Sequence, residues 1–137
     1  MSIDFESVTA GQPLPELKLP PIDRTTLALF AGASGDHNPI HIDIDFARKA
    51  GMDDVFAQGM LSMAYLGRLL TDWAPQDRLR SFNVRFAGIT HLGDLLTCSG
   101  KVIEKFERNG ENLVKIEIQA VNQHGEVKIM GDALIAL

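Results

Sequence analysis

The prolines of this sequence are confined to its first 75 residues, and this distribution limits where a continuous β-sheet can form. They are Pro13, Pro15, Pro20, Pro21, Pro39 and Pro75. Proline has no backbone N–H to donate, so it is tolerated only at sheet edges, in turns and at strand starts. We therefore predict an extended start with a short edge strand near Leu17–Leu19, and uninterrupted sheet after Pro75.

The second half of the sequence has the pattern of antiparallel strands. Apolar and polar residues alternate from Val114 to Ala120, which is the two-residue period of a half-buried strand. Asn109-Gly110 predicts a tight hairpin before this strand, and residues 122–125, Asn-Gln-His-Gly, predict a turn after it. Three further strands complete an antiparallel meander: Ser81–Phe86, Leu95–Phe106 and Val127–Leu137.

One long helix is expected between the proline-rich start and the strands. Residues 59 to 72 are apolar on almost every side of such a helix, and a helix that is apolar all round is surrounded by protein. These elements predict an α+β fold in which an antiparallel sheet wraps around a long apolar central helix, in a single domain over residues 1–137. A sheet this small leaves a strand edge unpaired, so we also expect a dimer.

Two short helices are expected before the long one. Asp23 can cap the first, over Thr25–Ala31, and Gly32 can end it. Asp43 can cap the second, over Ala47–Ala50. The segment between the two helices has the composition of a loop.

Charge and composition exclude several classes of partner and location. The net charge is -5 and the sequence contains no run of Lys or Arg, so neither nucleic acid nor an anionic membrane surface is expected as a partner. The longest uncharged apolar stretch, Val55–Gly67, is shorter than the roughly 20 residues that a membrane-spanning helix needs. The acidic start does not resemble a signal peptide, and the single cysteine, Cys98, favours a reducing compartment. We expect a cytoplasmic protein.

The loop between the short helices carries the candidate chemistry, Asp36 and His41. A carboxylate and an imidazole that lie close together can share a water, one accepting a proton while the other donates one. Taken alone, each has a plain structural interpretation, since Asp is a common turn former and a single His is more often structural. A metal site is not expected, because Pro39 prevents the helix on which His37 and His41 would face one ion.

Gly59 opens the long helix and is a second candidate. The start of a helix offers unpaired N–H groups and partial positive charge, which can stabilise an oxyanion such as the enolate of a thioester. The plain alternative is that glycine only permits a sharp entry into the helix.

These residues together resemble the signature of a known family. Residues 30–41, Phe-Ala-Gly-Ala-Ser-Gly-Asp-His-Asn-Pro-Ile-His, resemble the signature of the MaoC-like, (R)-specific enoyl-thioester hydratases, which have the hot-dog fold. The segments Gly59-Met60-Leu61 and Asn83-Val84-Arg85-Phe86 follow in the order and spacing of that family. The resemblance covers nearly the whole chain.

The resemblance implies an activity and a role for each site residue. The reaction is hydration of a trans-2-enoyl thioester to the (R)-3-hydroxyacyl thioester, or the reverse dehydration, without metal or cofactor. Asp36 and His41 are the catalytic pair that holds and activates the water. Asn38 and Gly59 are the substrate-binding residues: Asn38 helps to set the loop, and the Gly59 N–H holds the thioester oxygen.

The resemblance leaves several alternatives open. Family members commonly carry His-Gly where this sequence has Gln58-Gly59, which leaves a side-chain role for residue 58 in doubt. The acyl group can be carried by coenzyme A or by acyl carrier protein, and coenzyme A would require a local cluster of basic residues. The chain can form a homodimer or a heterodimer, as the catalytic or a non-catalytic subunit. A hot-dog thioesterase is a further alternative. Phe56, Met63 and Tyr65 are candidates for limiting the depth of the acyl tunnel.

Overall fold

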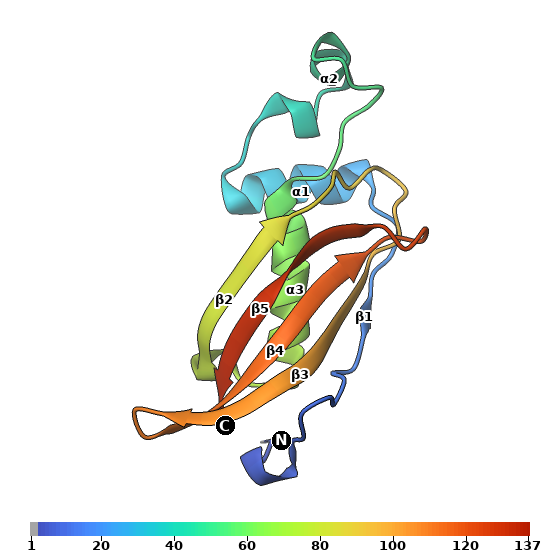
Figure 1. Cartoon of the computed structure of the whole chain (residues 1–137). Coiled ribbons are helices and arrows are strands. Elements are labelled where there is room, and N and C mark those ends of the chain that lie inside the picture. Colours follow the sequence, from blue (N-terminus) through green and yellow to red (C-terminus); the bar gives the residue numbers. More distant parts are fainter. Residues whose placement is uncertain (1–2) are drawn as a thin grey trace.

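The computed structural model describes residues 3–137 and contains one curled antiparallel sheet with a long helix along one face (Figure 1). The sheet has five strands in the order β1-β3-β4-β5-β2. The helix is α3, Gly59–Trp73, and the strands are β1 Leu17–Lys18, β2 Leu79–Phe86, β3 Thr97–Arg108, β4 Glu111–Val121 and β5 Val127–Ala136. The predicted sheet wrapped around a central helix is therefore present, and β1 is the expected short edge strand.

The expected meander is correct for β3, β4 and β5 but wrong for β2. The strand β2 does not pair with β3, which follows it in sequence; it pairs with β5 at the opposite edge, with Phe86 opposite Ile129. The hairpin partners β3 and β5 occupy both edges of β4, and β1 occupies the outer edge of β3. The outer edge of β5 is the one that remains for β2, so residues 87–96 must cross the end of the sheet.

The two predicted turns are confirmed. Asn109 and Gly110 have φ values of 52° and 79°, the left-handed pair that a two-residue hairpin requires. Between β4 and β5, the Asn122 side-chain oxygen accepts the N–H groups of His124 and Glu126, and Gly125 has a φ of 74°. These turns set the register of β3, β4 and β5.

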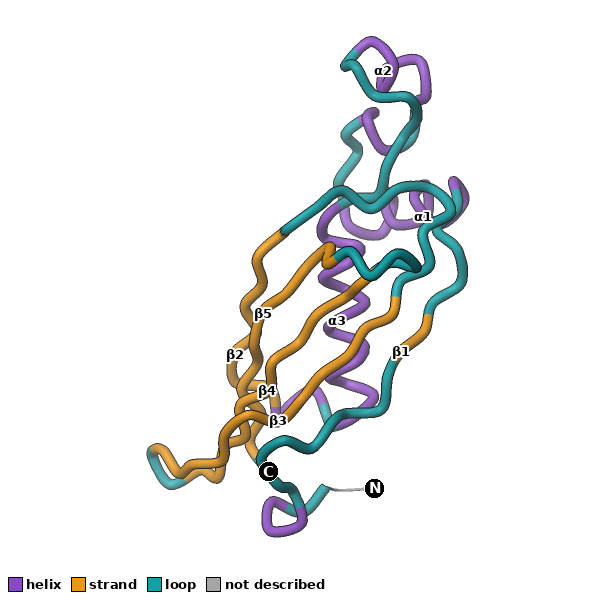
Figure 2. Tube along the Cα trace, turned by 45° about the vertical axis from the view of Figure 1, so that its right-hand side comes forward, coloured by secondary structure: helices purple, strands orange, loops and turns teal. Residues whose placement is uncertain are grey.

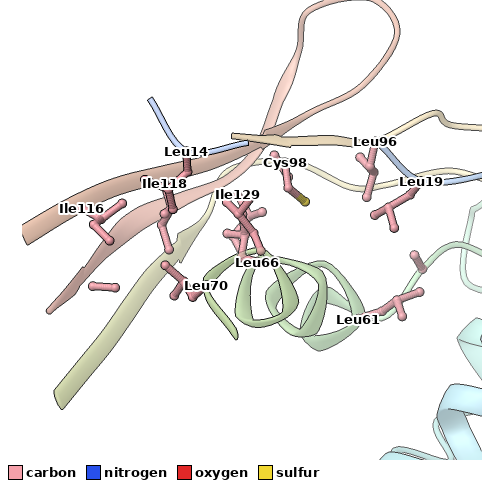
Figure 3. Close-up of a cluster of buried hydrophobic side chains, with 14 of the residues drawn as sticks. Leu14, Leu19, Leu61, Leu66, Leu70, Leu96, Cys98, Ile116, Ile118 and Ile129 are labelled. Carbon is pink, nitrogen blue, oxygen red and sulfur yellow. The ribbon is translucent and has the colours of Figure 1, made fainter. Parts of the chain in front are cut away.

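Helix α3 packs one face on the sheet and leaves the other exposed. Its leucines, among them Leu66 and Leu70, meet the inward side chains of the strands (Figure 3). The expectation that protein surrounds this helix is wrong for the single chain, because Met60 is 51% exposed and Ala64 and Arg68 are also exposed. Met60, Ala64 and Arg68 follow one another at intervals of four residues, so they form one exposed stripe along the helix. A sheet on one side cannot cover the stripe on the other.

The short helices lie beyond the sheet, at the start of α3 (Figure 2). Helix α1, Arg24–Ser34, is capped as predicted by Asp23, whose side chain accepts the Thr26 N–H at 2.8 Å. It does not end at Gly32, as expected, but continues to Ser34, because Gly35 is the residue that adopts the left-handed conformation and caps the helix. Helix α2, Ile44–Lys49, has the predicted Asp43 cap.

Three single turns of 3-10 helix complete the secondary structure, η1 Phe5–Ser7, η2 Pro39–His41 and η3 Gln76–Arg78. Within residues 3–137, no helix is both long enough and apolar enough to cross a bilayer.

Candidate active site

The end of α1 places Asp36 in a short loop. Gly35 turns the chain out of the helix, with its N–H donating to the Ala31 carbonyl at 3.1 Å. The Asp36 N–H then donates to Ser34 Oγ, and Asp36 Oδ1 accepts the Asn38 N–H, each at 3.2 Å. These bonds fix the carboxylate through one oxygen and leave Oδ2 available.

His41 is held by main-chain contacts. Asn38 caps the turn η2, because its side-chain oxygen accepts the Ile40 N–H at 3.1 Å. His41 Nδ1 lies 2.8 Å from the Phe56 carbonyl oxygen. A carbonyl oxygen only accepts, so the hydrogen belongs on Nδ1 and the neutral ring presents an unprotonated Nε2. The Phe56 ring also packs edge-on against the imidazole, with 5.1 Å between ring centroids.

The two predicted catalytic side chains converge. His41 Nε2 lies 3.7 Å from Asp36 Oδ2. This separation exceeds the roughly 2.7–3.2 Å of a direct hydrogen bond, and one water can contact both atoms. The His41 side chain is 10% exposed and that of Asp36 is 41% exposed, so the pair joins a buried base to a carboxylate that solvent reaches. Such a pair can hold a water and remove its proton.

Gly59 is the first residue of α3. Its N–H is one of the N–H groups of the first turn, which have no carbonyl partner within the helix. A Cβ atom at this position would lie 3.1 Å from two carbons of the Phe86 ring. Glycine therefore permits close packing of β2 against the helix start, in addition to offering its N–H. Asn38 is the other predicted substrate-binding residue. It lines neither the cavity that contains His41 nor the one that contains Asp36, and its side chain forms a hydrogen bond within its own turn.

Each member of the pair lines a different cavity. The first, about 390 Å³, is lined by His41 and Gly59, and we call it the His41 cavity. The second, about 360 Å³, is lined by Asp36 and by mostly apolar side chains, and we call it the Asp36 cavity. Its other lining residues are Phe30, Ser34, Met60, Met63, Ala64 and Phe82. Of the three residues considered as limits to tunnel depth, Phe56 lines the His41 cavity, Met63 lines the Asp36 cavity and Tyr65 lines neither.

Besides His41, four buried polar residues line the His41 cavity: Gln58, Ser62, Thr90 and Lys128. Among these four, Gln58 is the one that belongs to a sequence motif. Ser62 lies in α3, Thr90 in the 87–96 segment and Lys128 in β5, and none of these three belongs to a motif. Gln58 Nε2 donates to the Leu27 carbonyl oxygen at 2.9 Å and so ties the start of α3 to α1. The sequence alone did not predict a role for the side chain of residue 58. This bond gives it a structural one.

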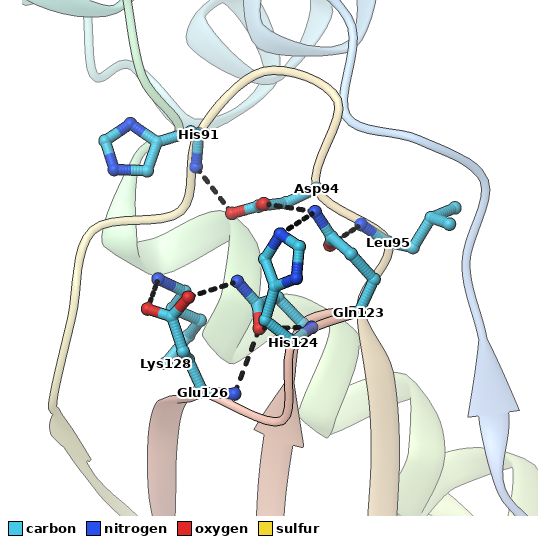
Figure 4. Close-up of polar contacts among 8 residues, drawn as sticks. His91, Asp94, Leu95, Gln123, His124, Glu126 and Lys128 are labelled. Atoms are coloured by element: carbon cyan, nitrogen blue, oxygen red, sulfur yellow. Dashed lines mark hydrogen bonds and ion pairs between the residues drawn. The ribbon is translucent and has the colours of Figure 1, made fainter.

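A polar network supports the wall of this cavity (Figure 4). Asp94 is buried, and its carboxylate accepts the His91 N–H at 2.9 Å and the Gln123 side-chain N–H at 3.1 Å. The 87–96 segment is thereby joined to the turn between β4 and β5. At the same turn, Lys128 Nζ lies 3.3 Å from a carboxylate oxygen of Glu126.

Charged groups beside the cavities are few. Among the residues that line the two cavities, Lys128 is the one lysine or arginine, and it is paired with Glu126. The basic cluster expected for coenzyme A is thus not part of either lining. In the described range 3–137, no group of three or more His, Cys, Asp or Glu residues is arranged to hold a metal ion.

The chain is similar to known proteins along most of its length. The family model described as "MaoC like domain" matches residues 5–124. The chain is 29% identical over 133 residues to the fatty acid synthase subunit beta of Saccharomyces cerevisiae, covering 95% of this chain and 6% of that protein. It is 26% identical to a mitochondrial 3-hydroxyacyl-[acyl-carrier-protein] dehydratase of Arabidopsis thaliana, covering 79% of this chain and 65% of the relative. It is 30% identical to the (R)-specific enoyl-CoA hydratase of Rhodospirillum rubrum, covering 69% and 66%.

Solved structures agree with this similarity. The R-hydratase PhaJ1 from Pseudomonas aeruginosa superposes with a TM-score of 0.84 at 30% identity, over 98% of this chain and 86% of that one. The chain also superposes on a protein of the ChsH1-ChsH2 complex from Mycobacterium tuberculosis, with a TM-score of 0.80 at 26% identity, over 94% and 98%. These neighbours confirm the predicted hot-dog fold.

Proposed function

The chain belongs to the MaoC-like domain family, and from this we propose that it catalyses (R)-specific hydration of trans-2-enoyl thioesters or the reverse dehydration of 3-hydroxyacyl thioesters. It would thus be a hydro-lyase of fatty-acid metabolism, as the names of its relatives suggest. The observation that carries the proposal is the 3.7 Å approach of His41 Nε2 to Asp36 Oδ2.

The proposed chemistry follows from the hydrogen positions around His41. Because Nδ1 donates to the Phe56 carbonyl, Nε2 is free to accept a proton from a water that Asp36 Oδ2 orients. The water oxygen bonds to C3 of the enoyl group as the C2=C3 π bond breaks. The proton held on Nε2 then goes to C2, which leaves a 3-hydroxyacyl thioester and a neutral imidazole. No cofactor enters this balance.

Gly59 has a separate role in this proposal. Addition at C3 moves negative charge onto the thioester oxygen, and the N–H at the start of α3 is suited to stabilise that charge. Support comes from the His41 cavity, because Gly59 and His41 line it together. Asn38 contributes by fixing the turn that carries His41.

A direct assay tests the proposal. The purified chain is mixed with crotonyl-CoA, and loss of the enoyl-thioester absorbance is followed together with release of free thiol. We expect the absorbance to fall without free thiol and the product to be the (R)-3-hydroxyacyl thioester. Release of thiol would favour a thioesterase instead, and no reaction with crotonyl or longer enoyl groups would favour a non-catalytic subunit.

The carrier of the acyl group is decided by the same assay. A panel of enoyl groups from crotonyl to dodecenoyl is supplied on coenzyme A and on acyl carrier protein. Neither cavity lining offers a basic cluster for coenzyme A phosphates, and Lys128 is already paired. We therefore expect at least equal activity with the carrier protein, and a strong preference for coenzyme A would contradict this expectation.

We further propose that two copies of the chain associate. The outer edge of β2 is unpaired within residues 3–137, and exposed apolar side chains, those of Phe86 and Met60, lie beside it. A homodimer of the 15.0 kDa chain is expected in sedimentation equilibrium, and Met60→Glu should shift it toward monomer. A monomeric parent chain would favour a heterodimer with a different subunit.

The compartment is also a proposal. Cys98 is buried within the sheet, and burial raises the pKa of its thiol to about 11, so the residue suits a structural role in a reducing cytoplasm. Fractionation of the producing cells, with antibodies to this chain, tests the location. Recovery with membranes or from the medium would contradict it.

A further inference from the structure

The trans double bond of the proposed substrate determines which cavity receives the acyl chain. Across a trans C2=C3 bond, the thioester and the chain from C4 onward extend in opposite directions. Gly59, whose N–H is proposed to hold the thioester oxygen, lines the His41 cavity. With C3 at the pair of Asp36 and His41, which lie 3.7 Å apart, the chain from C4 onward extends into the Asp36 cavity.

The lining of the Asp36 cavity agrees with this direction. The polar lining residues are Ser34 and Asp36, which lie at the end of α1, on the side where the water is held. The rest of the lining is apolar and comes from Phe30, Met60, Met63, Ala64 and Phe82. Transfer of acyl carbons from water to such surroundings is favourable.

The ring of Phe82 closes this cavity along α3. Met60, Met63 and Ala64 line it from the first turns of the helix, and Gly67 lies one turn further on. A Cβ atom at Gly67 would lie 3.5 Å from Phe82 Cε1, which is van der Waals contact. The ring therefore covers the helix at Gly67, and Gly67 does not line the cavity.

Phe82 is held in this position by the neighbouring strand. It lies on β2 directly opposite Ala133 of β5, and Ala133 is 0% exposed. Residues directly opposite each other in an antiparallel pair share a face of the sheet, so Phe82 points toward α3. The ring also packs against the hydrophobic core. A longer acyl chain could displace it only by disrupting this packing.

The wall between Asp36 and the ring sets a length. An α-helix rises about 1.5 Å per residue, so the wall from Met60 to Ala64 is roughly 6 Å long. An extended acyl chain advances about 1.3 Å per carbon, because its bonds of about 1.5 Å form a zigzag. About four or five carbons beyond C3 therefore fit before the chain meets Phe82.

We propose that Phe82 limits the acyl group of the substrate to about eight carbons, because its ring closes the Asp36 cavity over Gly67. The proposal rests on the proposed function, and it narrows the substrates to short and medium-length enoyl groups. Met63 lines the same cavity, but α3 continues past it to Gly67, so Met63 shapes the side of the cavity and Phe82 its end.

A series of trans-2-enoyl-CoA substrates tests the limit. The series contains the crotonyl, hexenoyl, octenoyl, decenoyl and dodecenoyl groups. We expect kcat/KM of the parent chain to fall about tenfold or more between octenoyl-CoA and dodecenoyl-CoA, since a single methylene group already changes kcat/KM by about that factor in an apolar pocket.

Variants of Phe82 should move this limit. Phe82→Ala opens the cavity toward Gly67, so the ratio of kcat/KM for dodecenoyl-CoA to that for crotonyl-CoA should rise about tenfold or more. Phe82→Leu disturbs the core less and should raise the ratio by a smaller factor. The ratio compares two substrates in one preparation, so it does not depend on the fraction of folded protein. Adding Gly67→Leu to Phe82→Ala should lower the ratio again, because the leucine side chain fills the space that the ring leaves.

The matched control is Phe106→Leu on β3, the same chemical change at a residue that lines neither cavity. It should leave the ratio unchanged. The inference is overturned if the parent chain hydrates dodecenoyl-CoA as efficiently as hexenoyl-CoA, if neither Phe82 variant raises the ratio, if Gly67→Leu fails to lower it, or if Phe106→Leu raises it equally. Hydration of the whole series without a length limit would leave the proposed function standing, whereas hydration of no substrate would overturn both.

Discussion

At the scale of single residues, His41 is oriented by a main-chain carbonyl. The Phe56 oxygen accepts from Nδ1 at 2.8 Å, and the strand-like contact between Phe56 and His91 holds that carbonyl in place. A carbonyl does not change its charge with pH, so Nδ1 keeps its hydrogen whenever the ring is neutral. This arrangement leaves Nε2 available for the chemistry that we propose it shares with Asp36.

Removing either member of the pair should abolish most hydration without unfolding the chain. We expect Asp36→Asn and His41→Ala each to lower kcat by about 10²–10⁴-fold, the usual contribution of acid–base catalysis. Steady-state kinetics on crotonyl-CoA, with circular dichroism to check folding, measures the loss. His37→Ala is the control, because His37 is an exposed neighbour in the same loop. A folded Asp36→Asn variant with near-parental turnover would disprove the assignment.

The thiol of Cys98 should be inert in the folded chain. It is fully buried, and desolvation raises its pKa to about 11, so almost no thiolate is present at pH 8. Iodoacetamide at pH 8 should leave the native protein unmodified, as followed by intact mass, and should alkylate it in urea. Rapid alkylation of the native protein would contradict the buried placement of this residue in β3.

At the scale of elements, the contact between β2 and β5 depends on one glycine. A Cβ atom at Gly131 would lie 1.8 Å from the Asn83 carbonyl oxygen, which is a backbone atom and cannot move aside alone. The two strands approach this closely where β5 passes Val84. A side chain at position 131 would push β2, and with it Phe86, away from the start of α3.

Gly131→Ala should therefore destabilise the protein by about 3 kcal/mol or more, as severe overpacking does. Urea unfolding followed by circular dichroism measures the change. Gly32→Ala is the matched control: Gly32 lies inside α1 with open space around its Cβ position, so alanine should stabilise the protein by about 0.5–1 kcal/mol. Equal effects of the two substitutions would show that β2 and β5 are not in close contact.

At the scale of the whole molecule, ion pairs and helix caps make the stability of the folded chain depend on pH. Hydrogen bonds lower the pKa values of three carboxyl groups, those of Asp23 by Thr26, Glu111 by Arg80 and Glu126 chiefly by Asn122. Their usual values are 3.8 for Asp and 4.5 for Glu. Each of these carboxyl groups therefore becomes protonated at a higher pH in the unfolded chain than in the folded one.

The stabilisation from these groups is therefore present above their usual pKa values and is lost as pH falls through the lower folded values. We expect the Tm to decrease when the pH is lowered from 6 toward 3, as followed by scanning calorimetry. Glu111→Gln should reduce the size of this decrease. A Tm that rises on acidification would contradict the direction of the three shifts.

The features that the sequence alone predicted are those set by neighbours in the chain. The Asp23 and Asp43 caps, the start of α3 at Gly59 and the left-handed Asn109-Gly110 turn each depend on a few adjacent residues. The end of α1 was placed at the wrong glycine, because two glycines three residues apart offer the same local signal. Asp36 and His41 were recognisable because they occupy one short motif.

Contacts between distant segments were decided by the tertiary structure. The position of β2 beside β5 depends on which strand edge remains after the hairpins close, and the exposed stripe of α3 depends on how much of the helix one sheet can cover. The acceptor for His41 Nδ1 is a carbonyl 15 residues away, and the polar wall of the His41 cavity combines residues of α3, the 87–96 segment and β5. Periodicity and turn chemistry act over a few residues, whereas these contacts exist only once packing has brought separate elements together.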